Sequence, residues 1–267
     1  MFQIGIFLVF QLFLIIWVGS FIVVGIFFLV RAYQTKLKSL IYGGIALIIA
    51  AISQIGRQLF DFNLLVTRMI LSFGFILVVV FTNMIFHRDR KSKLPTFILI
   101  ITVINFFLET GLAFFSMAIV SDYTFYLNVT QDTLNRFIVF NWMAWSTFSA
   151  YKEIRVLDIE PWVKTRYKIL SFITFFFSFH NIPFFFQPWN VDFGDPNDIR
   201  SFIVFGIISV FAIIFAIGFS LTWFIPKWFK RFLNKGYNII EEKEYTEEEL
   251  MALIRKQITE EDSNRNN

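Results

Sequence analysis

Seven long apolar segments constrain the fold of this 267-residue chain more than any other feature. They span approximately residues 5–30, 39–60, 64–86, 95–119, 134–150, 169–187 and 201–225. Most are long enough to cross a hydrocarbon core of about 30 Å as a helix. A bilayer admits only helices or closed barrels, and these segments lack the alternating pattern of barrel strands. The sequence therefore predicts an all-α, polytopic membrane protein built as a seven-transmembrane-helix bundle.

The basic residues predict how this bundle is oriented. Sixteen of the 24 lysines and arginines lie in the stretches 31–38, 87–93, 151–168 and 227–235. The opposite side carries few basic residues, which stand among aspartates: Arg57, Arg68, Arg136 and Arg200. Because short cytoplasmic loops are enriched in lysine and arginine, we expect the N-terminus outside and the C-terminus in the cytoplasm. The expected location is the cell membrane.

Composition narrows the function classes. Apolar residues make up 57% of the chain and the mean hydropathy is +0.64, which excludes a soluble domain. The net charge of +4 is explained by anionic lipid headgroups, so no nucleic-acid partner is expected. Cysteine is absent, and the two histidines, His87 and His180, fall near opposite faces of the membrane. We therefore expect no metal site and no cofactor.

The chain divides into a membrane domain, 1–235, and a cytoplasmic tail, 236–267. After Pro226, residues 227–233 combine aromatic and basic side chains, as in a short interfacial helix or a frayed end of the last crossing. A capping-box pattern begins at Thr246 and predicts an amphipathic helix near 247–259, followed by a disordered end. Its apolar stripe, which would bind a cytoplasmic partner, consists of Leu250, Leu253, Ile254 and Ile258.

The connections between segments carry turn residues. Asp, Asn, Gly and Pro in 120–133 and 187–199 predict exposed outer loops, and a tight turn is expected at 61–63. Residues 35–40 are similar to residues 165–170, and each stretch leads into an outward-running segment. This similarity indicates either a parallel three-helix repeat or merely the basic residues that precede any such helix.

Polar residues at bilayer depth are the candidate site. An ionisable group at a helix centre costs roughly 2.5–3.5 kcal/mol, and Glu109 lies near the middle of the fourth segment. The polar residues concentrate in the outer half, which predicts a ligand-binding cavity open to the outside, or else hydrogen bonds that join the helices. The candidate ligand-binding residues are Gln54, Arg57, Gln58, Asp61, Arg68, Asn105, Glu109, Asn141, Trp145, His180 and Asn181.

The chain resembles the seven-helix sensor region that precedes many prokaryotic histidine kinases. The similarity covers residues 5–233 and rests on Arg31, the polar stretch 57–61 and the basic stretch 164–168. This resemblance implies detection of an extracellular or intramembrane signal. The expected topology also resembles that of rhodopsins, but residues 201–225 contain no lysine for a retinal Schiff base.

Three functional hypotheses remain. The first is a non-enzymatic receptor or sensor in which Glu109 and Arg68 anchor a small ligand or lipid and segments 5–7 shift to signal through the tail. The second is a small-molecule transporter or facilitator that uses the three-helix repeat. The third is a membrane scaffold whose tail recruits a soluble partner. No pair of His, Ser or Asp residues stands at catalytic spacing, so we do not expect an enzyme.

Overall fold

The computed structural model describes residues 2–60, 62–88, 92–157 and 159–235, with backbone only at 2–4, 6 and 57–59. Within these ranges the chain is helical and contains no strand. The elements are α1 (Phe2–Thr35), α2 (Lys38–Leu59), α3 (Leu64–Phe86), α4 (Leu94–Ala118), α5 (Asp122–Ile154), α6 (Pro161–Phe177), the 3-10 helix η1 (Ile182–Phe186), α7 (Ile199–Trp223) and α8 (Lys227–Leu233). The expected all-α architecture is confirmed.

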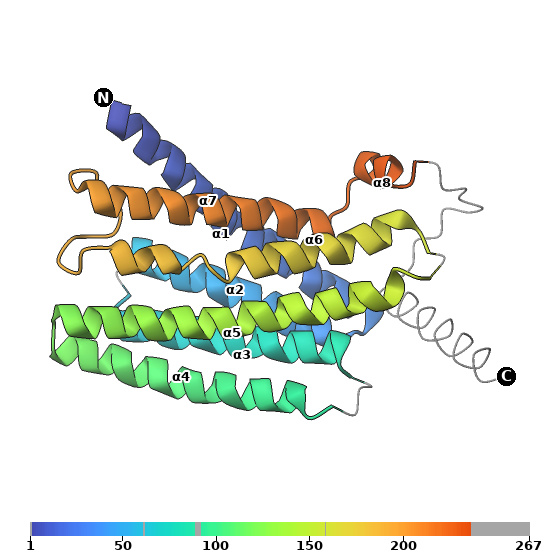
Figure 1. Ribbon diagram of the computed structural model, residues 1–267, viewed down its shortest axis with the longest axis horizontal. Coiled ribbons are helices and arrows are strands. Elements are labelled where there is room, and N and C mark those ends of the chain that lie inside the picture. The colour runs from blue at the N-terminus through green and yellow to red at the C-terminus, as the bar shows by residue number, and fades with distance from the viewer. Residues whose placement is uncertain (1, 61, 89–91, 158, 236–267) are drawn as a thin grey trace.

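The seven long helices lie side by side along the long axis of the molecule (Figure 1). Each packs against its neighbour in the chain, α1 packs against α7 to close the ring, and α3 also contacts α5. Six segments are long and apolar enough to cross a membrane: α1, α2, α3, α4, α7 and the unit formed by α6 and η1. The protein is therefore a helical, multi-pass membrane protein.

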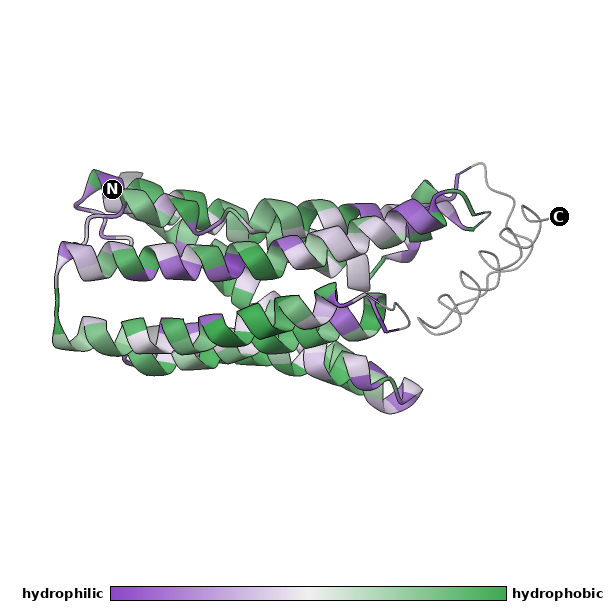
Figure 2. Ribbon diagram, turned by 60° about the horizontal axis from the view of Figure 1, so that its bottom comes forward, coloured by the Kyte–Doolittle hydropathy of each residue, from purple (hydrophilic) through white to green (hydrophobic). Residues whose placement is uncertain are grey.

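Helix α5 does not meet this apolar criterion, although it is as long as α1 and runs through the bundle. Figure 2 shows hydrophilic residues along α5, which is the helix that the loop at the left of the view joins to α4. Four polar side chains in its first half are buried: Asn128, Asp132, Asn135 and Arg136. Because α5 packs against α3, α4 and α6, its neighbours supply the polar partners that lipid lacks.

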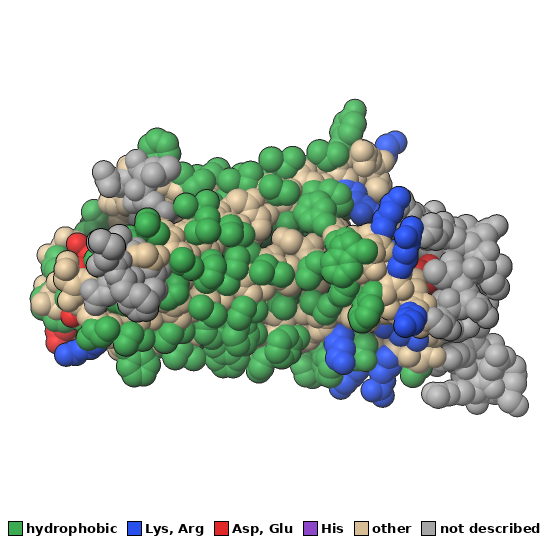
Figure 3. Space-filling model, turned by 90° about the horizontal axis from the view of Figure 1, so that it is seen from above, with side chains coloured by type: hydrophobic (Ala, Val, Ile, Leu, Met, Phe, Trp, Pro, Cys, Tyr) green, Lys and Arg blue, Asp and Glu red, His purple; other side chains and the backbone are tan. Residues whose placement is uncertain are grey.

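Charge is separated along the bundle axis. Figure 3 shows lysines and arginines gathered at the end where α8 lies, and acidic together with basic side chains at the other end. The surface between them is apolar, and isoleucine, leucine and phenylalanine side chains of α1, α4 and α7 are exposed there. This is the surface that a protein needs when lipid chains surround its middle and water its two ends.

The first third of α5 corrects one prediction. Residues 120–133 were expected to form an outer loop, but α5 begins at Asp122. Ser121 accepts a hydrogen bond from the Thr124 amide, and the Thr124 hydroxyl accepts one from the Ser121 amide, which completes a capping box. Asn128 and Asp132, which had indicated a loop, are instead buried inside the bundle, whereas Asp122 is exposed at the start of the helix.

The sixth segment was also placed incorrectly. A helix was expected over 169–187 and a long inner loop over 151–168, but α6 begins at Pro161 and ends at Phe177. Proline at the first turn loses no helical hydrogen bond. Pro183 cannot donate to the ladder, so the chain leaves the α-helix before it and continues as η1. Residues 178–181 therefore form an irregular turn inside the bundle.

Helix α8 follows Pro226 as a separate helix, so the frayed-end alternative is wrong. Asn234, which ends α8, donates from Nδ2 to Glu160 Oε2 (2.8 Å), and its Oδ1 accepts from the Trp162 amide (3.2 Å). These bonds hold α8 against the start of α6. The expected tail helix over 247–259 lies outside the described residues.

The two stretches of the expected repeat differ in structure. Residues 35–40 contain the break between α1 and α2, where Lys36 has a positive φ of 59°. Residues 165–170 lie entirely within α6. The two similar stretches therefore do not occupy equivalent positions at the starts of two helices.

Candidate functional site

A buried ionic network joins three helices, and the turn after a fourth, in the half of the bundle opposite α8. Helix α3 contributes Arg68 and, one turn further, Ser72. The Arg68 guanidinium Nη1 contacts Glu109 Oε1 on α4 at 3.1 Å. Ser72 donates to the other carboxylate oxygen of Glu109 at 2.5 Å, and Asn135 Nδ2 on α5 donates to the same oxygen at 2.7 Å. Glu109 is thus enclosed by three donors and only 1% exposed.

Asp132 is the centre of this network. It lies one turn before Arg136 on α5, and its Oδ1 and Oδ2 accept from Arg136 Nε (2.7 Å) and Nη2 (3.1 Å). Oδ2 also contacts Arg68 Nη1 at 2.5 Å. One carboxylate therefore bridges two guanidinium groups, and the buried cluster holds two positive and two negative side chains. Removal of one member would leave a buried charge without its counter-charge.

His180 extends the network to the irregular turn after α6. Arg136 Nη1 lies 2.8 Å from His180 Nε2, and an arginine can only donate, so Nε2 accepts. The Nδ1 atom lies 2.8 Å from the Phe177 carbonyl oxygen and donates to it. These two partners assign a neutral imidazole with its proton on Nδ1. The turn at 178–181 is therefore held by the same arginine that binds Asp132.

Amide side chains flank the ionic network. Gln131 Nε2 donates to Asn105 Oδ1 at 3.1 Å and joins α5 to α4. Asn181 Nδ2 donates to the Thr133 hydroxyl at 2.8 Å and joins the turn after α6 to α5. The sequence offered two interpretations of these polar residues, and the structure contains the interhelical hydrogen bonds that one of them predicts.

The structure brings Arg68, Asn105, Glu109, His180 and Asn181 of the expected site to this region. Asn141 donates instead to the Phe137 carbonyl oxygen of its own helix, and Trp145 is 59% exposed on the surface. The side chains of Arg57 and Gln58, and residue Asp61, lie outside the described part of the structure. Gln54 lines a cavity, which lies beside the network.

Asp132 and Arg136 are the functional candidates that the sequence interpretation missed. The sequence predicts a fifth segment that begins at 134, which leaves Asp132 in an outer loop and Arg136 at the outer end of the segment. Their i,i+4 spacing and the Ser121 N-cap are the signals that would have extended the helix and paired the charges.

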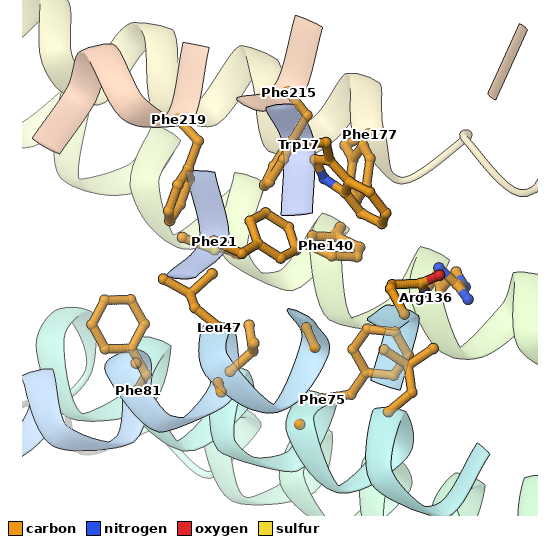
Figure 4. Close-up of a pocket in the computed structure, with 18 of the residues that line it drawn as sticks. Trp17, Phe21, Leu47, Phe75, Phe81, Arg136, Phe140, Phe177, Phe215 and Phe219 are labelled. Atoms are coloured by element: carbon orange, nitrogen blue, oxygen red, sulfur yellow. The ribbon is translucent and has the colours of Figure 1, made fainter. Parts of the chain in front are cut away.

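The cavity is enclosed by six helices and is largely apolar (Figure 4). Its volume is about 60 Å³, measured as the space open to the centre of a water molecule. One water needs roughly 10–15 Å³ by this measure, so several water-sized groups fit. The walls are mainly aromatic and include Trp17 and Phe21 on α1, Phe75 on α3, Phe140 on α5, Phe177 on α6, and Phe215 and Phe219 on α7.

Polar groups meet the cavity at few places. Arg136 lines it and connects it directly to the ionic network, as Figure 4 shows at the right of the view. Gln54 on α2 also lines it. The indole of Trp17 is 9% exposed, and its Nε1 has no hydrogen-bond partner. The network itself is packed, whereas the empty space beside it is apolar, which differs from the polar cavity expected from the sequence.

Comparison of the chain with protein-family models, with curated proteins and with solved structures finds no match. Within the described residues, no group of three His, Cys, Asp or Glu side chains is arranged to hold a metal ion. The arrangement combines an apolar space with an electrically balanced network that reaches one wall of that space through Arg136.

Proposed function

We propose that this protein is a non-enzymatic receptor or sensor of the cell membrane that binds a small ligand or lipid inside its helix bundle. The cavity carries this proposal, because its walls come from every long helix except α4. A ligand there contacts six helices at once, so binding favours the helix arrangement that fits it best. A scaffold that only recruits a partner has no need of such a space.

The charge distribution supports seven crossings with the N-terminus outside. The end that carries most lysines and arginines is the one at which α8 lies, and basic residues favour the cytoplasmic face. Helix α5 is the seventh crossing in this proposal. Its buried charges are compatible with the bilayer because they are paired within the bundle.

The ionic network supports a route from ligand to output. Arg136 touches the cavity, Asp132 and His180, so a ligand that moves this side chain acts on α3 and on the turn after α6. The signal would then shift α5, α6 and α7 relative to one another. The tail, with its expected helix near 247–259, is the proposed output element.

A transporter or facilitator is the second candidate, because the helix break at 178–181 lies beside the network. Interrupted helices mark substrate sites in many transporters, where they occur in pairs. Among the described spans this break has no counterpart in α1–α3 at a comparable depth. The receptor is therefore the better interpretation.

A thermal-shift screen beside a transport assay tests the proposal. Purified protein is heated with a panel of metabolites and lipids, and each compound that raises Tm is tested for uptake into liposomes that contain the protein. We expect a raised Tm without uptake. Uptake of a stabilising compound would instead favour the transporter.

Two variants locate the binding site. Ala46→Leu adds bulk to the cavity wall, and we expect it to abolish the increase in Tm. Ala118→Leu makes a similar change at the exposed end of α4 and should preserve it. A ligand whose effect survives Ala46→Leu would bind elsewhere and would contradict the cavity proposal.

A further inference from the structure

The chemistry of the ligand follows from the groups that face the cavity, on the premise that the cavity is the receptor site just proposed. The walls between Phe81 and Phe219 at one end and Arg136 at the other are apolar (Figure 4). Apolar walls of this kind favour an apolar ligand body, and aromatic side chains pack well against flat or slender groups. Most of the ligand is therefore hydrocarbon.

Apart from the Gln54 amide, which can both donate and accept, the polar groups that meet the cavity are donors. Trp17 Nε1 carries a buried N–H without a partner. Arg136 has five N–H groups and uses three of them, toward Asp132 and His180. One N–H on each of Nη1 and Nη2 remains. A buried donor without a partner is unfavourable, and a ligand oxygen that accepts from Trp17 or Arg136 would remove this cost.

The charge of the network selects between acceptor groups. Arg68 and Arg136 already balance Glu109 and Asp132, and the partners of His180 assign it as neutral. A carboxylate in the cavity would add a buried negative charge without a counter-charge. A neutral carbonyl oxygen accepts the same hydrogen bonds and leaves the balance unchanged.

We propose that the cavity binds a neutral, slender lipophilic molecule that carries a carbonyl or similar acceptor oxygen. The hydrocarbon part lies against the aromatic walls of α1, α3, α5 and α7. The oxygen accepts from Trp17 Nε1 or from the unused N–H groups of Arg136. Through Arg136 the oxygen also touches the ionic network, so the site distinguishes a ligand with an acceptor from a plain hydrocarbon.

Three probes with similar hydrocarbon bodies test this inference: methyl nonyl ketone, decanoic acid at neutral pH, and undecane. The affinity of purified full-length protein for each is obtained from the dependence of Tm on probe concentration. We expect the ketone to bind more tightly than undecane and more tightly than the acid. The effect of one neutral hydrogen bond is roughly two- to tenfold in affinity.

A pair of tryptophan variants identifies the donor side. Trp17→Phe removes the indole N–H at the cavity, and we expect it to weaken ketone binding roughly two- to tenfold more than undecane binding. Trp223→Phe also removes an unpartnered buried indole N–H, but Trp223 does not line the cavity. It should leave the ratio of ketone to undecane affinity unchanged. Neither residue belongs to the ionic network, so folding does not depend on a broken ion pair.

The possible failures are distinguishable. Tighter binding of the acid, or equal affinity of the wild-type protein for ketone and undecane, overturns the neutral-acceptor inference and leaves the receptor proposal standing. Equal loss of ketone and undecane binding in Trp17→Phe shows that the oxygen does not accept from Trp17 and assigns it to Arg136. Suppose that no probe raises Tm, but that a metabolite does so in the wild-type protein and not in Ala46→Leu. The proposed ligand class is then wrong, and the cavity is still the site. If no compound binds the cavity, both proposals are overturned.

Discussion

At the scale of single residues, the ionic network depends most on Asp132, because this carboxylate contacts two guanidinium groups. Asp132→Asn keeps the volume but removes the carboxylate that pairs with Arg136 and leaves Arg68 with Glu109 alone. Loss of one member of a buried ion pair costs about 3–5 kcal/mol. We therefore expect a large decrease in Tm, measured on protein purified in detergent.

The control for this variant is Asp122→Asn, at the exposed first turn of α5. Asp122 lies at a helix N-terminus, where a negative charge contributes only about 0.3–1 kcal/mol. We expect a small effect on Tm. If Asp132→Asn were no more destabilising than Asp122→Asn, the buried carboxylate would not hold the two arginines as the structure shows.

The same residues show how far a site can be predicted from sequence. Glu109 and Arg68 stood out because each is a charge inside an apolar run, and the structure places them in contact. Asp132 and Arg136 do not lie in an apolar run, since the polar residues Asn128, Gln131 and Asn135 are their neighbours in sequence. A hydropathy profile cannot separate a polar loop from a polar helix that is buried by its neighbours. The apolar cavity could not be predicted either, because in the sequence its lining residues cannot be distinguished from ordinary core residues.

At the scale of helices, α1 and α2 approach so closely that only glycine fits at one contact. A Cβ atom added to Gly44 would lie 2.8 Å from the Gly25 carbonyl oxygen, which is backbone and cannot move aside alone. We expect Gly44→Ala to force the two helices apart and to destabilise the protein by about 1–3 kcal/mol. The measurement is Tm in detergent.

Gly111→Ala is the matched control, because a Cβ at Gly111 meets nothing within 4 Å. Alanine favours the helix over glycine by about 0.8–1.0 kcal/mol, so Tm should stay the same or rise. A decrease equal to that of Gly44→Ala would show that the contact between α1 and α2 does not determine the effect.

Helix ends were predictable where a capping residue or a proline lies next to an apolar segment. Asn63, which accepts from the Val66 amide, and Pro95 mark the starts of α3 and α4 as expected. The ends of α6 were not found, because Pro161 lies in the charged stretch 151–168 and the break after Phe177 lies inside an apolar run. There the turn is held by long-range contacts of His180 and Asn181, which a local pattern does not contain.

At the scale of the whole molecule, the polar α5 decides between six and seven crossings. The chain contains no cysteine, so a single cysteine at each end of α5 reports its side of the membrane. Asp122→Cys and Lys152→Cys both lie at exposed positions. With an impermeant maleimide on intact cells, we expect labelling at 122 and none at 152 until the membrane is opened. Labelling at both positions from outside would refute a crossing by α5.

The tail is the proposed output element, and its role can be tested separately from that of the bundle. The described structure through residue 235 packs α8 against α6, and the cavity uses only residues between Trp17 and Phe219. We therefore expect deletion of residues 240–267 to leave Tm, the labelling pattern and ligand stabilisation unchanged. Isolated helices as short as that expected over 247–259 are marginal in water, so its apolar stripe needs a surface to pack against.

In a receptor this surface belongs to a cytoplasmic partner or to the inner ends of the helices, and the stripe carries the response. Ligand-dependent cross-linking from a cysteine placed at position 250 measures that response in the full-length chain. We expect the cross-linked products to change when ligand is added, and Ala46→Leu to abolish the change. If the products were the same with and without ligand, the tail would not report occupancy of the cavity, and the transporter would become the better explanation of the bundle.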